Sequence, residues 1–185
     1  MKIGDILYFS PGYRLSQLIT AEPLEIIDQI ERRIEWFYLG PADLLNKSSN
    51  AFSAGILCFA AIDSIARYEV GGYSSARFKK WIAKLPDFGQ LTGEEQDLVY
   101  DDFRNGLVHE GRIMRAVQFT YEITKAVHIQ NGVVFMNPRI LIDQIRVALK
   151  SYIENTKSDR KKLLILARAI MEDFSEDFKL LPQVP

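Results

Sequence analysis

The sequence predicts an all-α, mainly helical fold with one β-hairpin inserted at about residues 118–136. Two observations favour this fold class. Apolar residues recur every three or four positions in most segments, which is the spacing of a helix with one buried face. Only one segment alternates apolar and polar residues instead, and an Asn-Gly pair lies within it. The length of 185 residues favours a single domain, 1–185.

Composition and charge exclude several classes of protein. The net charge of -1 argues against a strongly basic nucleic-acid-binding protein, although a local patch can still bind phosphate. One cysteine and two histidines predict neither a disulfide nor a zinc site, and no metal or cofactor is expected. The longest apolar run, 54–62, is far shorter than the ~20 residues of a membrane span. We therefore expect a cytoplasmic protein that does not bind a membrane.

The first expected helix covers Glu22 to Tyr38. Residues 1–20 show no clear pattern beyond a turn at Pro11-Gly12. From Glu22 onward, apolar residues recur at helical spacing with charged residues between them, and Gly40-Pro41 is expected to end this helix.

Residues 49–70 predict the most buried helix. They are apolar on nearly every side, which is typical of a helix at the centre of its domain. Gly71-Gly72 is expected to end it. The inward stripe is expected to consist of Phe52, Ile56, Phe59, Ala66 and Val70.

Further helices follow on both sides of the hairpin. Residues 74–85 predict a short amphipathic helix, and Thr92 with Glu95 three residues later forms the pattern of a capping box. Asn137-Pro138 is expected to begin another helix, with Asn as its cap. Ser158 is expected to cap a last helix at about 159–175.

The hairpin prediction includes a register. Alternating residues lead up to Asn131-Gly132, and a second β-rich run follows. With Asn131-Gly132 at the turn, Ile129 lies opposite Val134 and Val127 opposite Met136, so that apolar residues face apolar ones.

The segment 101–112 carries the most specific set of polar side chains. Asn105 and His109 are four residues apart and Arg112 is three further on, so a helix places all three on one face. Arg104 lies about 140° from His109 around an ideal helix. The two converge only through the long Arg104 side chain, through a kink near Gly106, or through a second copy of the segment.

These residue types suit cleavage of RNA without a metal. A base that takes the 2′-hydroxyl proton lets the alkoxide attack the adjacent phosphorus, and imidazole has a suitable pKa of about 6.5. Cationic donors stabilise the charge that builds on the phosphoryl oxygens. A separate acid should protonate the leaving 5′-oxygen, and this segment of one chain offers only His109. A symmetric dimer would supply two His109 and two Arg104 side chains.

The pattern Arg104-Asn105-x-x-x-His109 resembles the R-x(4–6)-H motif of HEPN domains (higher eukaryotes and prokaryotes nucleotide-binding), in many of which Asn follows the Arg. The stretch from Phe59 to Ile65 resembles the helix that pairs with the motif helix in that family, and the resemblance covers roughly residues 50–115. The hairpin and the first segment lie outside the minimal family pattern.

The resemblance implies a HEPN-like helical bundle, with its motif-bearing core at about 22–115, that dimerises through the motif helices. It also implies that active members are metal-independent endoribonucleases. Carried over to this chain, Arg104 would hold the scissile phosphate, Asn105 would position the motif and His109 would be the acid and base.

Other polar residues leave two interpretations open. A buried carboxylate at Asp63 needs a partner, which is either Arg67 in the same helix or the site, where Asp63 would orient Arg104 or His109. Arg112 either contacts phosphate or makes a salt bridge or dimer contact.

The basic strip formed by Arg77, Lys80 and Lys84 has no acidic residue between Ser74 and Pro86. It is either an ordinary solvated helix face or a contact for the RNA backbone, and RNA binding would weaken steeply with salt. His128 is expected on the polar face of the hairpin.

Two functions from different classes follow. The first is a HEPN-type endoribonuclease that acts on RNA as a homodimer, of the sort found in toxin or defence systems, with an antitoxin or another protein as partner. The alternative is a catalytically inactive HEPN-like module that binds nucleotide, RNA or a protein partner. A purely structural dimer is a third, weaker candidate.

Overall fold

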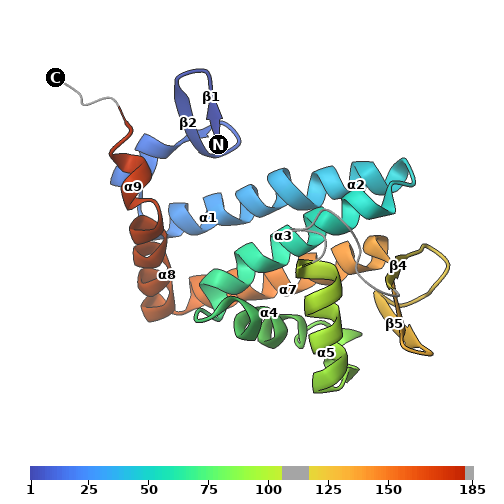
Figure 1. The fold of residues 1–185 in the computed structure, drawn as a ribbon. Coiled ribbons are helices and arrows are strands. Elements are labelled where there is room, and N and C mark those ends of the chain that lie inside the picture. The colour runs from blue at the N-terminus through green and yellow to red at the C-terminus, as the bar shows by residue number, and fades with distance from the viewer. Residues whose placement is uncertain (106–116, 182–185) are drawn as a thin grey trace. The chain divides into compact units, whose positions relative to one another are not determined.

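The structure, a computed structural model, describes residues 1–105 and 117–181, without the side chains of residues 103–105. The prediction of a mainly helical fold is confirmed, because helices make up most of the described chain beside two three-stranded sheets (Figure 1). The chain divides into two compact units, Met1–Phe37 with Lys150–Pro185, and Tyr38–Leu149. The description of residues 1–185 as a single domain stays a prediction.

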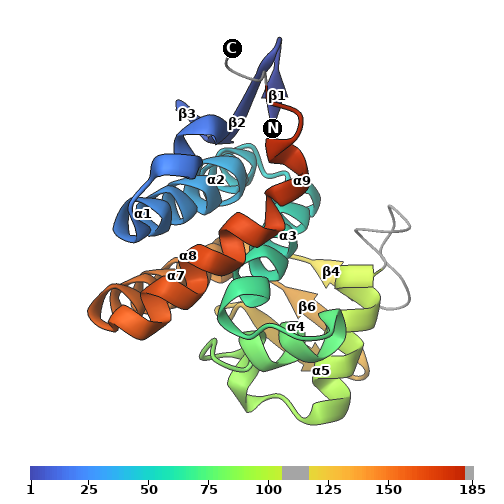
Figure 2. The ribbon, with the colours of Figure 1, turned by 90° about the vertical axis from the view of Figure 1, so that its left-hand side faces the viewer.

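The unit that contains both ends of the chain combines a small sheet with helices. Its sheet is an antiparallel meander in which Gly4 and Gly12 occupy the turns with φ angles of 56° and 74°. Helices α1 and α8 pack against each other (Figure 2). The elements are β1 (Lys2–Ile3), β2 (Ile6–Ser10), β3 (Tyr13–Arg14), η1 (Leu15–Thr20), α1 (Pro23–Ile34), the end of α7 (Pro138–Ser158), α8 (Arg160–Asp173) and α9 (Ser175–Phe178).

Arg33 joins the sheet and helices of this unit. The carbon of its guanidinium lies 5.4, 5.3 and 5.6 Å from the ring centres of Phe9, Phe37 and Phe174. The same group donates a hydrogen bond to the Phe9 carbonyl. A cation over aromatic faces is attracted by their negative charge, so Arg33 holds three phenylalanine rings from separate elements together.

The second unit is built around α3. Its elements are α2 (Gly40–Lys47), α3 (Ala51–Glu69), α4 (Ser74–Ile82), η3 (Phe88–Gln90), α5 (Gly93–Val99), η4 (Tyr100–Asn105), β4 (Val117–Phe119), β5 (Val127–Gln130), β6 (Val133–Met136) and the beginning of α7. Helix α3 contacts α2, α4, η4 and β4.

The helix predicted at 22–38 ends earlier than expected and more helix follows it. Helix α1 ends at Ile34, a π-helical turn η2 (Glu35–Leu39) comes next, and α2 begins at Gly40. The prediction that Gly40-Pro41 ends the helical segment is therefore wrong. The π turn changes the hydrogen-bond register before the proline. Pro41 then stands in the first turn of α2, where a backbone N–H has no acceptor within the helix, so the proline costs no helical hydrogen bond.

The helix predicted at 49–70 is confirmed as α3. The Asn50 side chain caps it by accepting a hydrogen bond from the Ser53 N–H at 3.2 Å, and Gly71 and Gly72 follow with φ angles of 69° and 78°. The predicted inward stripe is only partly right, because Phe52 is 38% exposed. The buried positions are Ala54, Gly55, Cys58, Phe59, Ala61, Ile62, Ile65 and Ala66.

Within the described residues, α3 is the one helix that is long and apolar enough to cross a membrane. The buried core helix of a soluble protein has the same length and composition, so this is weak evidence for a membrane span.

Three predicted helix caps can be compared with the structure. The Thr92–Glu95 capping box is present at the start of α5, and the Asn137 side chain accepts from the Arg139 N–H at 3.1 Å at the start of α7. The cap of α8 is Asp159 instead of Ser158, because its carboxylate accepts from the next helical N–H groups. The same bonds lower the pKa of Asp159.

The predicted hairpin is present with the predicted register. Strands β5 and β6 pair antiparallel, with Ile129 opposite Val134 and Val127 opposite Met136. Asn131 and Gly132 form the turn with φ angles of 52° and 73°, as this type of hairpin turn requires.

The residues before β5 differ from the prediction. The alternating pattern from Phe119 predicted one continuous strand, but only β4 is a strand there, and it pairs parallel to β6. Side chains satisfy the backbone of the loop that follows. Asn137 donates to the Ile123 carbonyl at 2.9 Å, and one oxygen of Asp87 accepts from the Ala126 N–H at 2.6 Å. The same Asp87 oxygen accepts from the Gln144 amide at 2.6 Å.

Replacement of Asp87 should test this support of the loop. Asp87→Ala leaves the fully buried Ala126 N–H without its acceptor, so we expect the free energy of unfolding to fall by about 1–3 kcal/mol in urea denaturation. Asp87→Asn keeps an acceptor oxygen and should lose less. Asp143→Ala removes an exposed carboxylate beside Gln144 and should change stability by no more than about 0.5 kcal/mol. Equal losses for Asp87→Ala and Asp143→Ala would contradict the assignment.

Candidate active site

The predicted catalytic segment begins in η4. The backbone of Arg104 and Asn105 forms the end of this π-helical turn, which continues α5 directly. Their side chains, and His109 and Arg112 entirely, lie outside the described residues. The face that Asn105, His109 and Arg112 are expected to share therefore stays a prediction.

The turn that carries Arg104 is anchored by aromatic contacts. The Tyr100 ring meets the edge of the Phe78 ring at 5.4 Å between centres, and Phe78 stacks on Phe59 of α3 at 5.9 Å. Val99 and Asp102, on either side of Tyr100, are 0% and 2% exposed. These contacts fix the start of the motif segment against α3 and α4, and η4 contacts both helices.

The described end of α5 continues into the π-helical turn η4, which ends at Asn105. Each turn of a π helix contains more residues than a turn of an α-helix. The angle of about 140° between Arg104 and His109 assumes an ideal α-helix over positions outside the described residues, so it stays a prediction. Single π turns inside helices are frequent at functional sites.

Asp63 belongs to the helix that contacts the start of the motif segment. It is half-buried on α3, with its Oδ1 atom buried, whereas Arg67 one turn later is exposed. Helix α3 contacts η4, and the helix pair that the HEPN resemblance implies stays a prediction. The two roles considered for Asp63, a pair with Arg67 or orientation of the motif residues, both stay predictions.

The thiol of Cys58 has no access to a substrate. Cys58 is 0% exposed in α3, and its sulfur lies 4.0 Å from the Pro138 carbonyl oxygen of α7. Burial raises the pKa of the Cys58 thiol far above its ordinary value, and the negative charge of Asp43 adds to this effect. The thiolate is the nucleophile in cysteine chemistry, and burial disfavours the thiolate of Cys58. We therefore interpret Cys58 as a core residue.

Metal-binding side chains do not cluster in the described part of the chain. In residues 1–105 and 117–181, no three His, Cys, Asp or Glu side chains lie close enough together to hold a metal ion.

His128 lies on the exposed face of the hairpin, as predicted. It is exposed on β5, and its ring stacks on that of Phe135 on β6 with 6.5 Å between centres. It also lines an open hollow of about 360 Å³ with Glu122, Thr124 and Lys125. This position makes His128 a suitable comparison residue for His109.

The predicted basic strip lies on α4 and the residues just after it. Lys84 forms an ion pair with Glu69 at the end of α3, whereas Lys80 is exposed. The sequence did not single out Tyr73, which precedes α4 and is 89% exposed. An aromatic residue gives no signal of exposure in a sequence, so only the structure identifies this position.

Comparisons of the chain with family models, with curated proteins and with solved structures found no match. The HEPN resemblance rests on the Arg104-Asn105-x-x-x-His109 pattern and on the stretch from Phe59 to Ile65 in the sequence.

The burial of Cys58 predicts its reactivity. The folded protein should not react with a thiol reagent such as DTNB over the time in which a free thiol reacts completely, because the side chain is enclosed and its pKa is raised. Unfolding in urea should release one reactive thiol per chain, since the sequence has one cysteine. Fast stoichiometric reaction of the folded protein would contradict the described packing of α3.

Proposed function

We propose that the chain is a metal-independent endoribonuclease of HEPN type that acts on RNA as a homodimer. The observation that carries this proposal is the Arg104-Asn105-x-x-x-His109 segment, which begins in a turn anchored against α3. That helix contains the stretch resembling the partner of the motif helix in HEPN domains. A cytoplasmic toxin or defence role, restrained by an antitoxin or another protein, fits such an activity.

The proposed reaction uses two histidines. One His109 takes the proton of the 2′-hydroxyl, and the oxygen attacks the adjacent phosphorus. Arg104 stabilises the charge on the phosphoryl oxygens as the bond to the 5′-oxygen breaks. The second His109, from the other subunit, gives its proton to the leaving oxygen. The products are a 2′,3′-cyclic phosphate and a 5′-hydroxyl, and no metal takes part.

The remaining predicted residues support these two groups. Asn105 positions the motif segment, and Arg112 contacts phosphate on the same face. Asp63 on the neighbouring α3 orients Arg104 or His109. Asn105 and Asp63 act through the placement of the reacting groups, and Arg112 only holds the substrate, so removal of any one of them should cost less than the removal of His109.

Removal of His109 should strongly slow cleavage. We expect the protein to cut single-stranded RNA in EDTA, and His109→Ala to slow the rate by about 10²–10⁴-fold, the usual contribution of acid–base catalysis. Gel analysis of labelled RNA measures the rate. The matched control is His128→Ala, which removes the other imidazole from an exposed position on β5 and should keep full activity. Full activity of His109→Ala would exclude the assignment, and RNA binding without any cleavage by the unaltered protein would favour the inactive module.

Removal of Arg104 should also reduce the rate. Arg104→Ala should lose about 10²–10³-fold, the usual effect of deleting one donor that stabilises a transition state. Arg168→Ala on α8 removes an exposed guanidinium, 83% of whose side chain is accessible, and should leave the rate unchanged. If both arginine variants lose activity equally, the effect is one of general charge and Arg104 has no special role.

The dimer can be tested by mixing subunits. The proposed homodimer has twice the chain mass of 21.2 kDa, and each centre needs two His109 side chains. When unaltered chains are mixed with His109→Ala chains and allowed to exchange, activity should follow the square of the unaltered fraction. A linear dependence, or a monomer mass in light scattering at the assay concentration, would contradict the shared centre.

A further inference from the structure

The exposed surface at the start of α4 combines one aromatic residue, Tyr73 directly before the helix, with cations of α4 and no carboxylate. Tyr73 is 89% exposed directly after the Gly71–Gly72 turn, in which both glycines have positive φ angles. Tyr73 is the extended N-cap residue of α4, and the Arg77 guanidinium reaches back to the Gly72 carbonyl just before it. Lys80 is three residues after Arg77, so these two cations share one face of the helix. The surface spans about 10 Å along the helix axis from Tyr73 to Lys80. The exposed residues Ala76 and Ala83 lie beside them.

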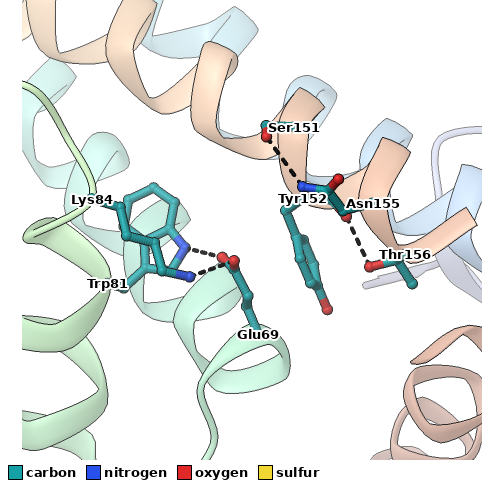
Figure 3. A network of polar contacts seen from close by, with 7 residues as sticks. All are labelled: Glu69, Trp81, Lys84, Ser151, Tyr152, Asn155 and Thr156. Atoms are coloured by element: carbon teal, nitrogen blue, oxygen red, sulfur yellow. Dashed lines mark hydrogen bonds and ion pairs between the residues drawn. The ribbon is translucent and has the colours of Figure 1, made fainter. Parts of the chain in front are cut away.

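Two lysines next to this face are already neutralised. Lys79 forms an ion pair with Asp97 of α5. Lys84 pairs with Glu69 of α3, whose other oxygen accepts from the Trp81 indole at 2.7 Å (Figure 3). The nearby carboxylates of Asp97 and Glu69 are therefore engaged by cations outside the Tyr73–Lys80 row.

Arg77 and Lys80 keep their charge available. Neither side chain forms an ion pair with a carboxylate in the part of the chain that the structure describes. The only hydrogen bond of the Arg77 side chain to a described residue is a long one of 3.4 Å to the Gly72 carbonyl, and its Nε has no partner there. Because Lys79 and Lys84 engage the nearby carboxylates, Arg77 and Lys80 are left as two cations close to the exposed Tyr73 ring.

We propose that Tyr73, Arg77 and Lys80 form a binding surface for a single nucleic-acid strand. A base stacks on the exposed face of the Tyr73 ring, while Arg77 and Lys80 contact the phosphates that follow it. Aromatic platforms combined with a row of cations are how proteins bind single strands without reading their sequence. An aromatic ring that is 89% exposed beside these cations offers a face on which a base can stack.

This surface goes beyond the proposed cleavage reaction. It uses none of the residues Arg104, Asn105 or His109, and it would serve a catalytically inactive chain equally well. Its ligand is recognised by phosphate charge and by base stacking, which RNA and DNA share. We therefore expect similar affinity for an RNA strand and a DNA strand of the same sequence.

The experiment measures binding without cleavage. A fluorescent single-stranded RNA oligonucleotide is titrated with His109→Ala protein, so that the probe stays intact, and anisotropy gives the affinity at several salt concentrations. Arg77→Gln with Lys80→Gln should weaken binding at least tenfold. The same pair should reduce the slope of log affinity against log salt by about 1.4, because each phosphate that a cation neutralises on a single strand contributes about 0.7. Lys80→Gln alone should give about half of this change in slope. Lys80 is exposed, so this variant avoids any effect on folding that replacement of the half-buried Arg77 would have.

Tyr73 is tested by the difference between two substitutions. Tyr73→Ala should weaken binding at every salt concentration without changing the slope, whereas Tyr73→Phe should keep the affinity because the ring remains. The charge-matched control is Lys150→Gln with Lys161→Gln, which removes two exposed lysines from α7 and α8. An equal loss in this control would overturn the proposal, as would binding of an acidic peptide but of neither nucleic-acid strand. Because the protein in this experiment lacks His109, these results are independent of whether the unaltered chain cuts RNA.

Discussion

The burial of α3 is the constraint on which the rest of the 38–149 unit depends. Only Phe52 and Arg67 are exposed along this helix, so neighbouring elements must cover it on almost every side, and α2, α4, η4 and β4 do so. Close approach is part of this packing. The Phe119 ring of β4 lies where a side chain at Gly55 would be, so any larger residue at position 55 would displace that ring. Placement of the hairpin and of the motif segment both follow from covering the same helix.

The link from this core to the proposed chemistry passes through three aromatic rings. Phe59 on α3 stacks with Phe78 on α4, and Phe78 contacts Tyr100 at the first residue of η4. Arg104 is four residues further along the same turn. The packing of the core thus positions the backbone at Arg104 and Asn105. In the proposed dimer, a second copy of the chain would supply the second imidazole. The α4 face that we propose for strand binding belongs to the same unit and depends on the same packing, since Phe78 and Trp81 bury its opposite side.

Local signals made the helices and the hairpin predictable from sequence. The Thr92–Glu95 box, the Asn137 cap and the Asn131-Gly132 turn each involve residues close in sequence, and all three are present in the structure. Features that depend on distant partners were not predictable. A helix that is apolar all round gives no signal of which side is buried, and the parallel pairing of β4 with β6 has no local signature. For the candidate site, the sequence offered the Arg104-Asn105-x-x-x-His109 pattern, whose shared face stays a prediction, whereas Tyr73 and the π turn at Arg104 required the structure.

The proposed function connects His109 and Arg104 through cleavage that uses the 2′-hydroxyl of the RNA. The most direct measurement is the chemical nature of the ends produced in EDTA, together with the fate of a substrate in which the nucleotide before the cleaved bond is 2′-deoxy. The proposed mechanism predicts 2′,3′-cyclic phosphate and 5′-hydroxyl ends, and no cleavage at the deoxy position. Ends that carry a 5′-phosphate, or cleavage that continues at the deoxy position, would contradict it.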